Sequence, residues 1–388
     1  MPELTTLALL AGLFMAVFAG QAVMYSNTFR VQIYVPGFLA DRGLNQAVAE
    51  KIFTSEAAQI IRGESIVPAP DMRIESEHGV LAALLQPLDL GEVVPALQSQ
   101  FGIDNLSVVA GVLQTATRPA AGDLKPLEMV LVVAQAQHGS QQTLITQDDG
   151  DPVALVRRSA AWTMEHVAPY RVALHHFLRF MGGDANGLAQ ARETVTRTLA
   201  TPLRPVTDTW DSSAASEYAM LYNMNGLIAA AGNDLPAALA AYHAIDRISQ
   251  VPPAVRAEVA LNKAVISLAL RQPGQAAELL LQARANQDHI HLPGFAIDLQ
   301  LVEGLIAWGN GDLENAERIF IAIRKVAPQR EAAHRYLGQV RAARGDRDGA
   351  ARALNDAAMA HHVEPPQEEL AVQLFWVDPV AGGLTKRF

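Results

Sequence analysis

Residues 225–242 read NGLIAAAGNDLPAALAAY, and residues 303–320 read EGLIAWGNGDLENAERIF. Each stretch carries a glycine near its start, an alanine twelve residues later and an aromatic residue four positions beyond that alanine. This spacing is typical of two helices that cross closely, because a small residue lets their axes approach and the bulky ring fills the next gap. Both stretches therefore predict a pair of helices joined by a short Gly- and Asn-rich turn.

The same register occurs four times in the second half of the chain. The small residues at the expected crossing points are Gly226, Ala264, Gly304 and Gly338. The alanines that follow are Ala238, Ala276, Ala316 and Ala350, and the bulky residues beyond them are Tyr242, Leu280, Phe320 and Leu354. Turn-forming residues such as Gly345-Asp346 separate the two helices of each unit. Four concordant units predict a helical array over residues 213–362.

This pattern resembles the tetratricopeptide repeat (TPR), whose small, alanine and aromatic positions the two quoted stretches match. The unit from Gly304 to Gly338 has the 34-residue period of that family. Longer intervals between the earlier units indicate insertions near Pro252 and near residues 289–293. The resemblance implies an α-helical TPR solenoid with a concave side that binds another polypeptide. An unrelated helical bundle with Ala-rich seams is the alternative.

In the TPR family, the positions that flank the small residue face the concave side. The residues of this sequence at those positions, which form the expected protein-binding groove, are Asn223, Glu258, Asn262, Leu305, Trp308, Arg335 and Gln339. Because only Arg335 is basic among them, the sequence departs from the Lys/Arg-rich clamp with which some members bind a C-terminal carboxylate. For Leu305 and Trp308, and for the neighbouring Leu227 and Val265, packing between adjacent units is an equally good interpretation.

An apolar stretch precedes these elements. Leu4 to Tyr25 reads LTTLALLAGLFMAVFAGQAVMY without a charged side chain, and about 20 such residues span a bilayer as an α-helix. Residues 1–28 are therefore predicted to be a single-pass membrane anchor with the lipid bilayer as a partner. A cleaved secretory signal is the alternative, although no Lys or Arg precedes the apolar run.

The charges beside this anchor bear on which side of the membrane holds the soluble part. Arg30 and Arg42 follow the apolar run, which by the positive-inside rule favours a cytoplasmic body. Long domains, however, translocate largely regardless of charge, and an N-terminal anchor ahead of one large soluble body commonly serves as an uncleaved export signal. We therefore expect the soluble part to be periplasmic.

Residues 29–150 carry the patterns of a small α/β domain. Strand patterns occur at Phe29–Val35, Leu106–Thr115, Pro126–Gln135 and Gln142–Thr146, and apolar residues at helical spacing occur at Asn45–Arg62. With the helices that follow, these elements predict an α+β protein. The element order, with the strand LSVVAGVLQ and a hairpin ahead of repeats, is similar to bacterial envelope proteins that place a TolB amino-terminal-like α/β domain before TPR units.

Helical patterns flank the predicted array on both sides. Residues 151–212 lack strand signals and are predicted to form leading helices. Residues 363–388 are predicted to hold a capping helix and a tail, with Glu368–Val377 as the closing helix.

Composition argues against several kinds of chemistry. The 388 residues have a net charge of −10 and include no cysteine, which disfavours a nucleic-acid partner and excludes thiolate metal sites. The sequence contains no glycine-rich phosphate loop. His289 and His291 have only Asp288 as a further metal ligand nearby in the sequence. We therefore expect no metal, no cofactor and no catalytic residue.

These patterns together predict a membrane-anchored scaffold or adaptor that binds another protein of the membrane or envelope and is not an enzyme. The alternative is an envelope small-ligand-binding protein or enzyme whose site lies in the α/β domain, around Glu75, His78 or Asp104. A third interpretation is a receptor-like subunit of a larger membrane complex, in which the repeats act as a fixed spacer.

Overall fold

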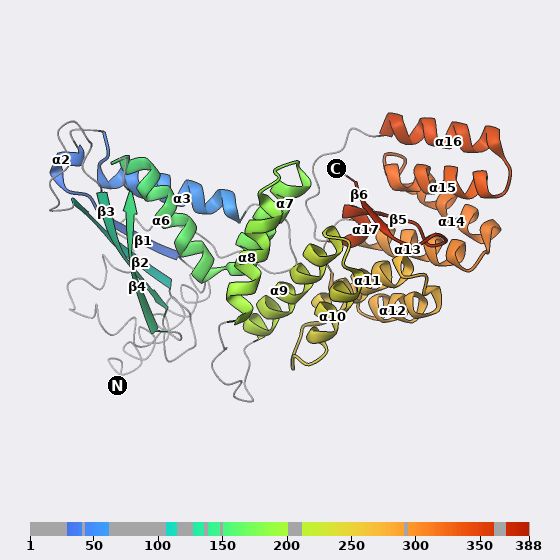
Figure 1. Ribbon diagram of the computed structural model, residues 1–388, viewed down its shortest axis with the longest axis horizontal. Helices are drawn as coiled ribbons and strands as arrows, with labels where there is room; N and C mark the ends of the chain where they lie inside the picture. Colours follow the sequence, from blue (N-terminus) through green and yellow to red (C-terminus); the bar gives the residue numbers. More distant parts are fainter. Residues whose placement is uncertain are drawn as a thin grey trace, which may run out of the picture. The chain divides into compact units, whose positions relative to one another are not determined.

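The computed structural model describes residues 29–40, 43–61, 106–114, 127–135, 139–147, 150–200, 212–290, 294–360 and 370–387 (Figure 1). These residues form two compact units, which divide between Val167 and Ala168. Most of them are helical, and a small sheet lies in the first unit. The predicted α+β class is therefore confirmed.

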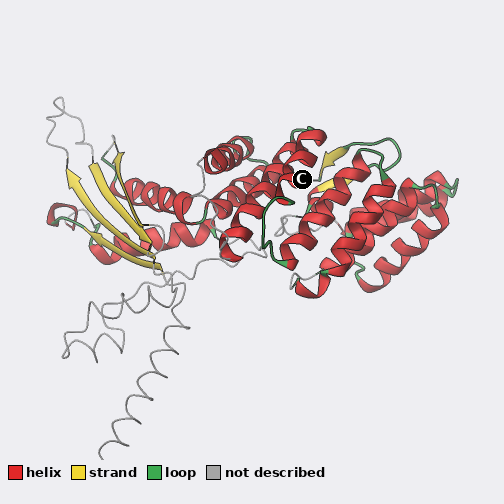
Figure 2. Cartoon of the chain, turned by 90° about the horizontal axis from the view of Figure 1, so that it is seen from below, coloured by secondary structure: helices red, strands yellow, loops and turns green. Residues whose placement is uncertain are grey.

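The first unit contains a four-stranded sheet of order β1-β2-β3-β4 (Figure 2). Its strands are β1 (Phe29–Tyr34), β2 (Leu106–Gln114), β3 (Leu127–Gln135) and β4 (Gly139–Gln147). β1 and β2 are parallel, whereas β2 pairs with β3 and β3 with β4 in antiparallel register. The four predicted strand positions are confirmed. Alternating apolar residues give each strand one face that can be buried against the helices.

Helices cover one face of this sheet. After the short helix α2 (Gly37–Ala40), α3 (Gln46–Ile60) packs against β1 and against α6 (Pro152–Val167), which also contacts β3 and β4. Phe53 of α3 and Leu131 of β3 are fully buried in the core that results. The predicted helix at Asn45–Arg62 is confirmed.

The role of α6 differs from the prediction, which placed residues 151–212 as leading helices of the array. Leu155, Val156 and Ala160 of α6 are fully buried in the core beside the sheet. The first unit therefore extends to Val167, because the apolar side of this helix closes the sheet core. A helical pattern looks the same whether the partner is a sheet or another helix.

The second unit contains ten helices in five consecutive pairs among its described residues 168–360. The pairs are α7 (Pro169–Met181) with α8 (Gly187–Ala200), α9 (Ser212–Ala231) with α10 (Leu235–Ile245), α11 (Pro253–Ala269) with α12 (Pro273–Ala285), α13 (Phe295–Gly309) with α14 (Leu313–Val326), and α15 (Glu331–Ala343) with α16 (Arg347–Ala360). Each pair packs on the next, and the first helices α9, α11, α13 and α15 contact one another in turn. The predicted helix pairs within residues 213–362 are confirmed.

Close helix crossings explain the glycines of these pairs. A Cβ atom added to Gly226 would lie 2.5 Å from the ring of Tyr242, and one added to Gly304 would lie 2.6 Å from the ring of Phe320. Carbon atoms do not approach so closely without a shift of one helix or ring. The first helix therefore carries a glycine where the large side chain of the second helix lies across it, as the spacing predicts.

The turns between paired helices share one backbone feature, a residue with a positive φ angle. Each of the last four pairs has a residue in the left-handed region, and these are Asn233 (φ 60°), Arg271 (φ 61°), Gly311 (φ 80°) and Gly345 (φ 86°). Three aspartates then cap the second helices of their pairs. Asp234 accepts a hydrogen bond from the N–H of Ala237 at 3.0 Å, Asp312 accepts one from the N–H of Asn315 at 3.2 Å, and Asp346 accepts one from the N–H of Gly349 at 2.8 Å. These caps satisfy N–H groups that the helix itself leaves free.

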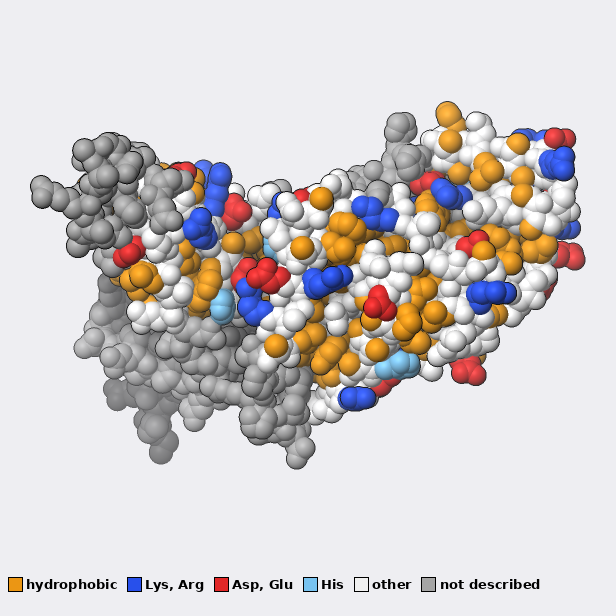
Figure 3. All heavy atoms as spheres, viewed as in Figure 1, with side chains coloured by type: hydrophobic (Ala, Val, Ile, Leu, Met, Phe, Trp, Pro, Cys, Tyr) orange, Lys and Arg blue, Asp and Glu red, His pale blue; other side chains and the backbone are white. Residues whose placement is uncertain are grey.

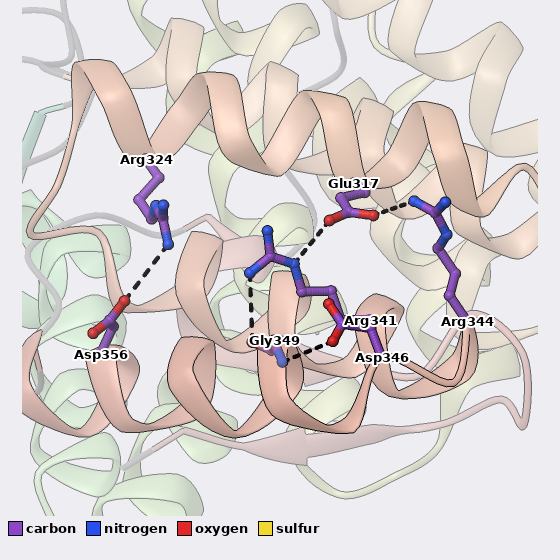
Figure 4. A network of polar contacts seen from close by, with 7 residues as sticks. All are labelled: Glu317, Arg324, Arg341, Arg344, Asp346, Gly349 and Asp356. Carbon is purple, nitrogen blue, oxygen red and sulfur yellow. Dashed lines mark hydrogen bonds and ion pairs between the residues drawn. The ribbon is translucent and has the colours of Figure 1, made fainter.

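A polar network joins the last three helices of the row (Figure 4). Glu317 of α14 accepts hydrogen bonds from Nε of Arg341, at 2.8 Å, and from the guanidinium of Arg344. Arg341 also donates to the carbonyl oxygen of Gly349 in α16, at 3.4 Å. One carboxylate therefore links α14 to α15, and Arg341 extends the connection to α16.

Residues 370–387 fold back onto the helix pairs. They form α17 (Ala371–Leu374), β5 (Phe375–Val377) and β6 (Leu384–Lys386), and the two strands pair with each other. A closing helix over Glu368–Val377 was predicted within the capping region 363–388, and the structure corrects it. The helix ends at Leu374 because the next residues run extended against α11, where Phe375 and Val377 are buried.

Membrane association concerns a different part of the chain. In the ranges that the structure describes, no helix combines the length and the apolar character that a membrane crossing requires. The predicted anchor at residues 1–28 lies outside the described residues.

Candidate functional site

Residues 370–387, here called the C-terminal segment, lie against the first helices of the row (Figure 1). α17 contacts α11 and α13, β5 contacts α11, and β6 contacts α9. The surface of α9, α11, α13 and α15 that the segment covers is called the docking face. Leu370, Ala371 and Leu374 are fully buried there, and Trp376 is 9% exposed. The segment is thus a packed part of the second unit.

A chain of amide hydrogen bonds connects the docking face to the main chain of the segment. Nδ2 of Asn223 donates to Oε1 of Glu258 at 3.0 Å, and Nδ2 of Asn262 donates to Oδ1 of Asn223 at 2.9 Å. Oδ1 of Asn262 in turn accepts the main-chain N–H of Ala371 at 2.7 Å. Asn223, Glu258 and Asn262 are fully buried. Because a side-chain amide both donates and accepts, the two asparagines form one continuous chain of hydrogen bonds from Glu258 to the main-chain N–H of Ala371.

Two more main-chain N–H groups of the segment have partners on the helices. Val377 donates to the hydroxyl oxygen of Tyr336 at 3.1 Å, and Gly383 donates to the carbonyl oxygen of Ala269 at 2.8 Å. Burial raises the pKa of Tyr336 to about 12, so its hydroxyl remains neutral at physiological pH. The docking face therefore binds peptide groups as well as side chains.

The side chain of Trp376 lies in an aromatic and cationic setting. Its ring meets that of Tyr336 edge to face, with 5.7 Å between the centroids. The guanidinium groups of Arg335 and Arg387 lie over the Trp376 ring, at 4.2 Å and 4.3 Å from its centroid. Both geometries are favourable for an electron-rich ring face, so Trp376 is held by quadrupole interactions in addition to its apolar contacts.

Two acidic side chains of the docking face hold polar groups of the segment. Asp298, which is fully buried, accepts a hydrogen bond from Nε2 of Gln373 at 2.8 Å and pairs with Arg330. The carboxylate of Glu331 lies 3.5 Å from the guanidinium of Arg387. Burial raises the pKa of Asp298, although Arg330 opposes that shift. Burial also lowers the pKa of Arg387, against the influence of Glu331.

Buried polar side chains are concentrated on the first helices. Those of α9, α11, α13 and α15 are Ser216, Asn223, Glu258, Asn262, Lys263, Ser267, Asp298, Glu331 and His334. On the face that Figure 3 shows, acidic and basic side chains of the helical unit are interspersed, and neither sign forms a large patch. Because burial of a polar group costs free energy unless it is hydrogen-bonded, the hydrogen bonds of Asn262 and Asp298 to the C-terminal segment offset part of that cost.

The structure places the predicted groove residues in different surroundings. Asn262 and Arg335 contact the C-terminal segment, and Asn223 and Glu258 are linked to it through hydrogen bonds. Leu305 instead lies fully buried in the helical core, as Leu227 and Val265 do.

The remaining two predicted groove residues lie near Tyr336. Trp308 is 9% exposed, and its ring meets that of Tyr336 edge to face at 6.4 Å. Gln339 is half-buried, and its Oε1 accepts no hydrogen bond from the described residues. Trp308 therefore packs beside the Tyr336 ring that contacts Trp376, whereas Gln339 has a side-chain acceptor that no described residue uses.

Sequence reasoning missed Asp298, Glu331 and Tyr336, and it missed the segment that these residues hold. The signal that could have found the segment is the run LAVQLFWV at residues 370–377, whose apolar and aromatic side chains require a partner surface. The run follows the last helix pair in sequence, which suggested an end cap. Nothing in the run itself identifies α11 and α13 as its partners.

The sequence also predicts a candidate site outside the helical unit. Glu75, His78 and Asp104, proposed for a site in the α/β domain, lie outside them. Within the described ranges, no cluster of His, Asp and Glu side chains could hold a metal ion. No protein-family model matches the chain, and no curated protein matches it either.

Proposed function

We propose that this chain is a scaffold or adaptor that binds another protein along its docking face and has no catalytic role. The observation that carries the proposal is the C-terminal segment itself. It is a stretch of polypeptide that the first helices hold through the N–H groups of Ala371, Val377 and Gly383. A surface with such acceptors can bind a polypeptide of another molecule in the same manner.

We further propose that the row of helix pairs is a TPR array. The close crossings at Gly226 and Gly304 support this assignment, as do the four concordant units and the 34-residue unit from Gly304 to Gly338. In arrays of this kind each pair contacts only its neighbours, which leaves the first helices along one continuous surface.

The proposal includes a membrane anchor at residues 1–28 and a periplasmic body. The uncharged run from Leu4 to Tyr25 supports the anchor. Two measurements test it in cells. The full chain should stay with the membrane after alkaline extraction, and a reporter fused after Phe388 that is active only outside the cytoplasm should give signal. Release into the soluble fraction contradicts the anchor, and a reporter active only in the cytoplasm contradicts the orientation.

Photo-crosslinking in native membranes tests the scaffold role. A photoreactive amino acid is placed at Arg335 or at Gln339, both on α15, and at Leu281 of α12 as the control, since Leu281 is 67% exposed away from the docking face. We expect an adduct of one defined mass from the α15 positions and none of that mass from Leu281. If no protein adduct forms at either α15 position, the scaffold proposal is wrong.

A further inference from the structure

We propose that the docking face binds its protein partner in place of the C-terminal segment, and that the bound part of the partner resembles that segment chemically. The bound part of the partner carries an apolar run with an aromatic residue, followed by a basic residue. This inference rests on the proposed scaffold function and names the surface, the class of ligand and the competitor that regulates it.

Buried polar groups on the docking face favour exchange over a permanent interface, although the segment also packs in the hydrophobic core through residues such as Leu370 and Phe375. Asn223, Glu258, Asn262 and Asp298 are fully buried beneath the segment or next to it. Surfaces that remain buried for the life of a protein are mostly apolar, because buried polar groups lose their hydration. When the segment leaves, water can satisfy these same amide and carboxylate groups. The bound and the open face are therefore closer in free energy than they would be for an apolar face.

The manner of binding also suits a separate peptide. Three of the contacts use main-chain N–H groups of the segment, at Ala371, Val377 and Gly383. Every polypeptide in an extended or turn conformation offers such groups, so these contacts require no particular sequence and no covalent link to α16. They provide affinity for a strand-like ligand of any origin.

Side-chain contacts then define which peptide fits. Tyr336 and Arg335 receive the ring of Trp376, and Glu331 lies beside the guanidinium of Arg387. Aromatic rings and arginines carry much of the binding free energy at protein interfaces. An aromatic residue on Tyr336 and a basic residue beside Glu331 are therefore the two features that we assign to the partner.

The segment competes from within the same chain. Residues 361–369, nine in number, join α16 to Leu370. A short tether gives an intramolecular ligand an effective concentration in the millimolar range (~1 mM). A free peptide of equal intrinsic affinity is therefore largely excluded while the segment is intact. Weakening the segment, without touching the docking face, should open the site.

The test measures binding of a synthetic peptide with the sequence of residues 370–387, labelled at position 380, because Val380 is 52% exposed. The labelled peptide is titrated with two proteins, the wild-type full chain and its Trp376→Ala/Arg387→Ala double variant, in which only the segment is altered. We expect the double variant to bind the peptide at least tenfold more tightly than the wild type. A Val380→Ala variant of the full chain is the matched control and should bind like the wild type. The peptide with Trp376→Ala should bind the double variant at least tenfold more weakly.

A thiol probe monitors folding in the same samples, since the chain has no cysteine of its own. Ala276 is fully buried in α12, so a cysteine introduced there by Ala276→Cys should stay protected from maleimide in both proteins. If the double variant keeps this protection and still binds the peptide no better than the wild type, the segment is a fixed part of the fold and the inference is wrong. If the double variant loses the protection, the array needs the segment in order to fold, which overturns the inference equally.

Two further outcomes separate this inference from the proposed function. If the wild type is a dimer that exchanges its C-terminal segments, the occupant is a second copy and the foreign partner is ruled out. If the peptide fails although crosslinks form at Arg335 or Gln339, the scaffold role stands and the assignment of the ligand falls. If the peptide binds but no crosslink forms in membranes, the scaffold role is the one that fails.

Discussion

The main-chain N–H of Ala371 donates a 2.7 Å hydrogen bond to Oδ1 of Asn262, although 109 residues separate the two in sequence. Asn262 uses its other amide atom, Nδ2, to donate to Asn223. One side chain therefore connects two first helices with the C-terminal segment. The stability of the segment and that of the helix row are coupled through this amide.

The variant Asn262→Ala tests this coupling. It leaves the N–H of Ala371 and Oδ1 of Asn223 without their present partner, and a buried group in that state costs about 1–3 kcal/mol. We expect the free energy of unfolding, measured with urea, to fall by about 2 kcal/mol after partial rehydration. The control is Asn355→Ala, at an exposed position of α16. Equal stability of the two variants would show that the amide chain contributes nothing.

Gly304→Ala tests the helix crossing between α13 and α14. The added methyl group would lie 2.6 Å from the ring of Phe320, so the ring or the helix must move. Overpacking of this kind costs about 1–3 kcal/mol, and the better helix propensity of alanine returns up to about 1 kcal/mol. We expect a net loss of about 1–2 kcal/mol in thermal or urea unfolding. Gly274→Ala, which meets nothing within 4 Å, should be neutral or stabilising.

Glu217 of α9 predicts a pH dependence of stability. Burial raises its pKa from the ordinary value of 4.5 to about 7, against opposing contributions from the hydrogen bond donated by the Tyr170 N–H and from Arg171. The folded state therefore binds this proton more tightly than the unfolded state. The stabilisation is complete below pH 4.5 and is lost as the pH rises through about 7.

Glu217→Gln removes this dependence, because the amide is neutral at every pH. We expect the variant to match the wild type in acid and to exceed its free energy of unfolding by about 1–3 kcal/mol near pH 8. Urea unfolding at several pH values measures the difference. Glu193→Gln, at a side chain that is 74% exposed, is the control and should follow the wild type throughout. A constant offset between Glu217→Gln and the wild type would contradict the prediction.

Glu317 tests the polar network at the end of the row. Its replacement by alanine removes the carboxylate that accepts hydrogen bonds from both Arg341 and Arg344. The polar contacts between α14 and the two arginines are then lost. We expect a loss of about 1–3 kcal/mol, because the side chain of Glu317 is only 16% exposed and both partners are cationic. Glu314→Ala, on the exposed side of the same helix, should change stability by less than about 0.5 kcal/mol. Hydrogen exchange of α15 and α16 should rise only in the first variant.

Local sequence patterns predicted much of this fold. The strands at Phe29–Tyr34 and Leu106–Gln114 follow from alternating apolar residues, and the helix pairs follow from the spacing of residues such as Gly304 and Phe320. These signals work because each depends on neighbours within about a dozen residues, a range over which periodicity determines which side of an element is buried. The boundary between the two units at Val167 was missed because it depends on which element α6 packs against, and local periodicity does not contain that information. An amphipathic helix does not specify what covers it.

The candidate site was predicted only in part. Asn262 and Arg335 were found because they flank the small residue of each pair, a local rule. Asp298 and Glu331 are charged residues on helices, and such residues are normally solvated, so the sequence gives no sign that they are buried. Their burial depends on a segment that contacts α11 and α13 from far along the chain. Contacts of such long sequence separation leave no periodic trace.

The order of synthesis gives the polar docking face one more consequence. The ribosome makes Asn262 well before Ala371, and at about 5–20 residues per second the interval between them lasts about 5–20 s. Throughout that time the nascent helices present an uncovered surface to the surrounding solution. An apolar surface exposed for this long would favour aggregation or chaperone binding during translation. Water can hydrate the amides and carboxylates of the docking face, so the helices remain soluble until the C-terminal segment is synthesised.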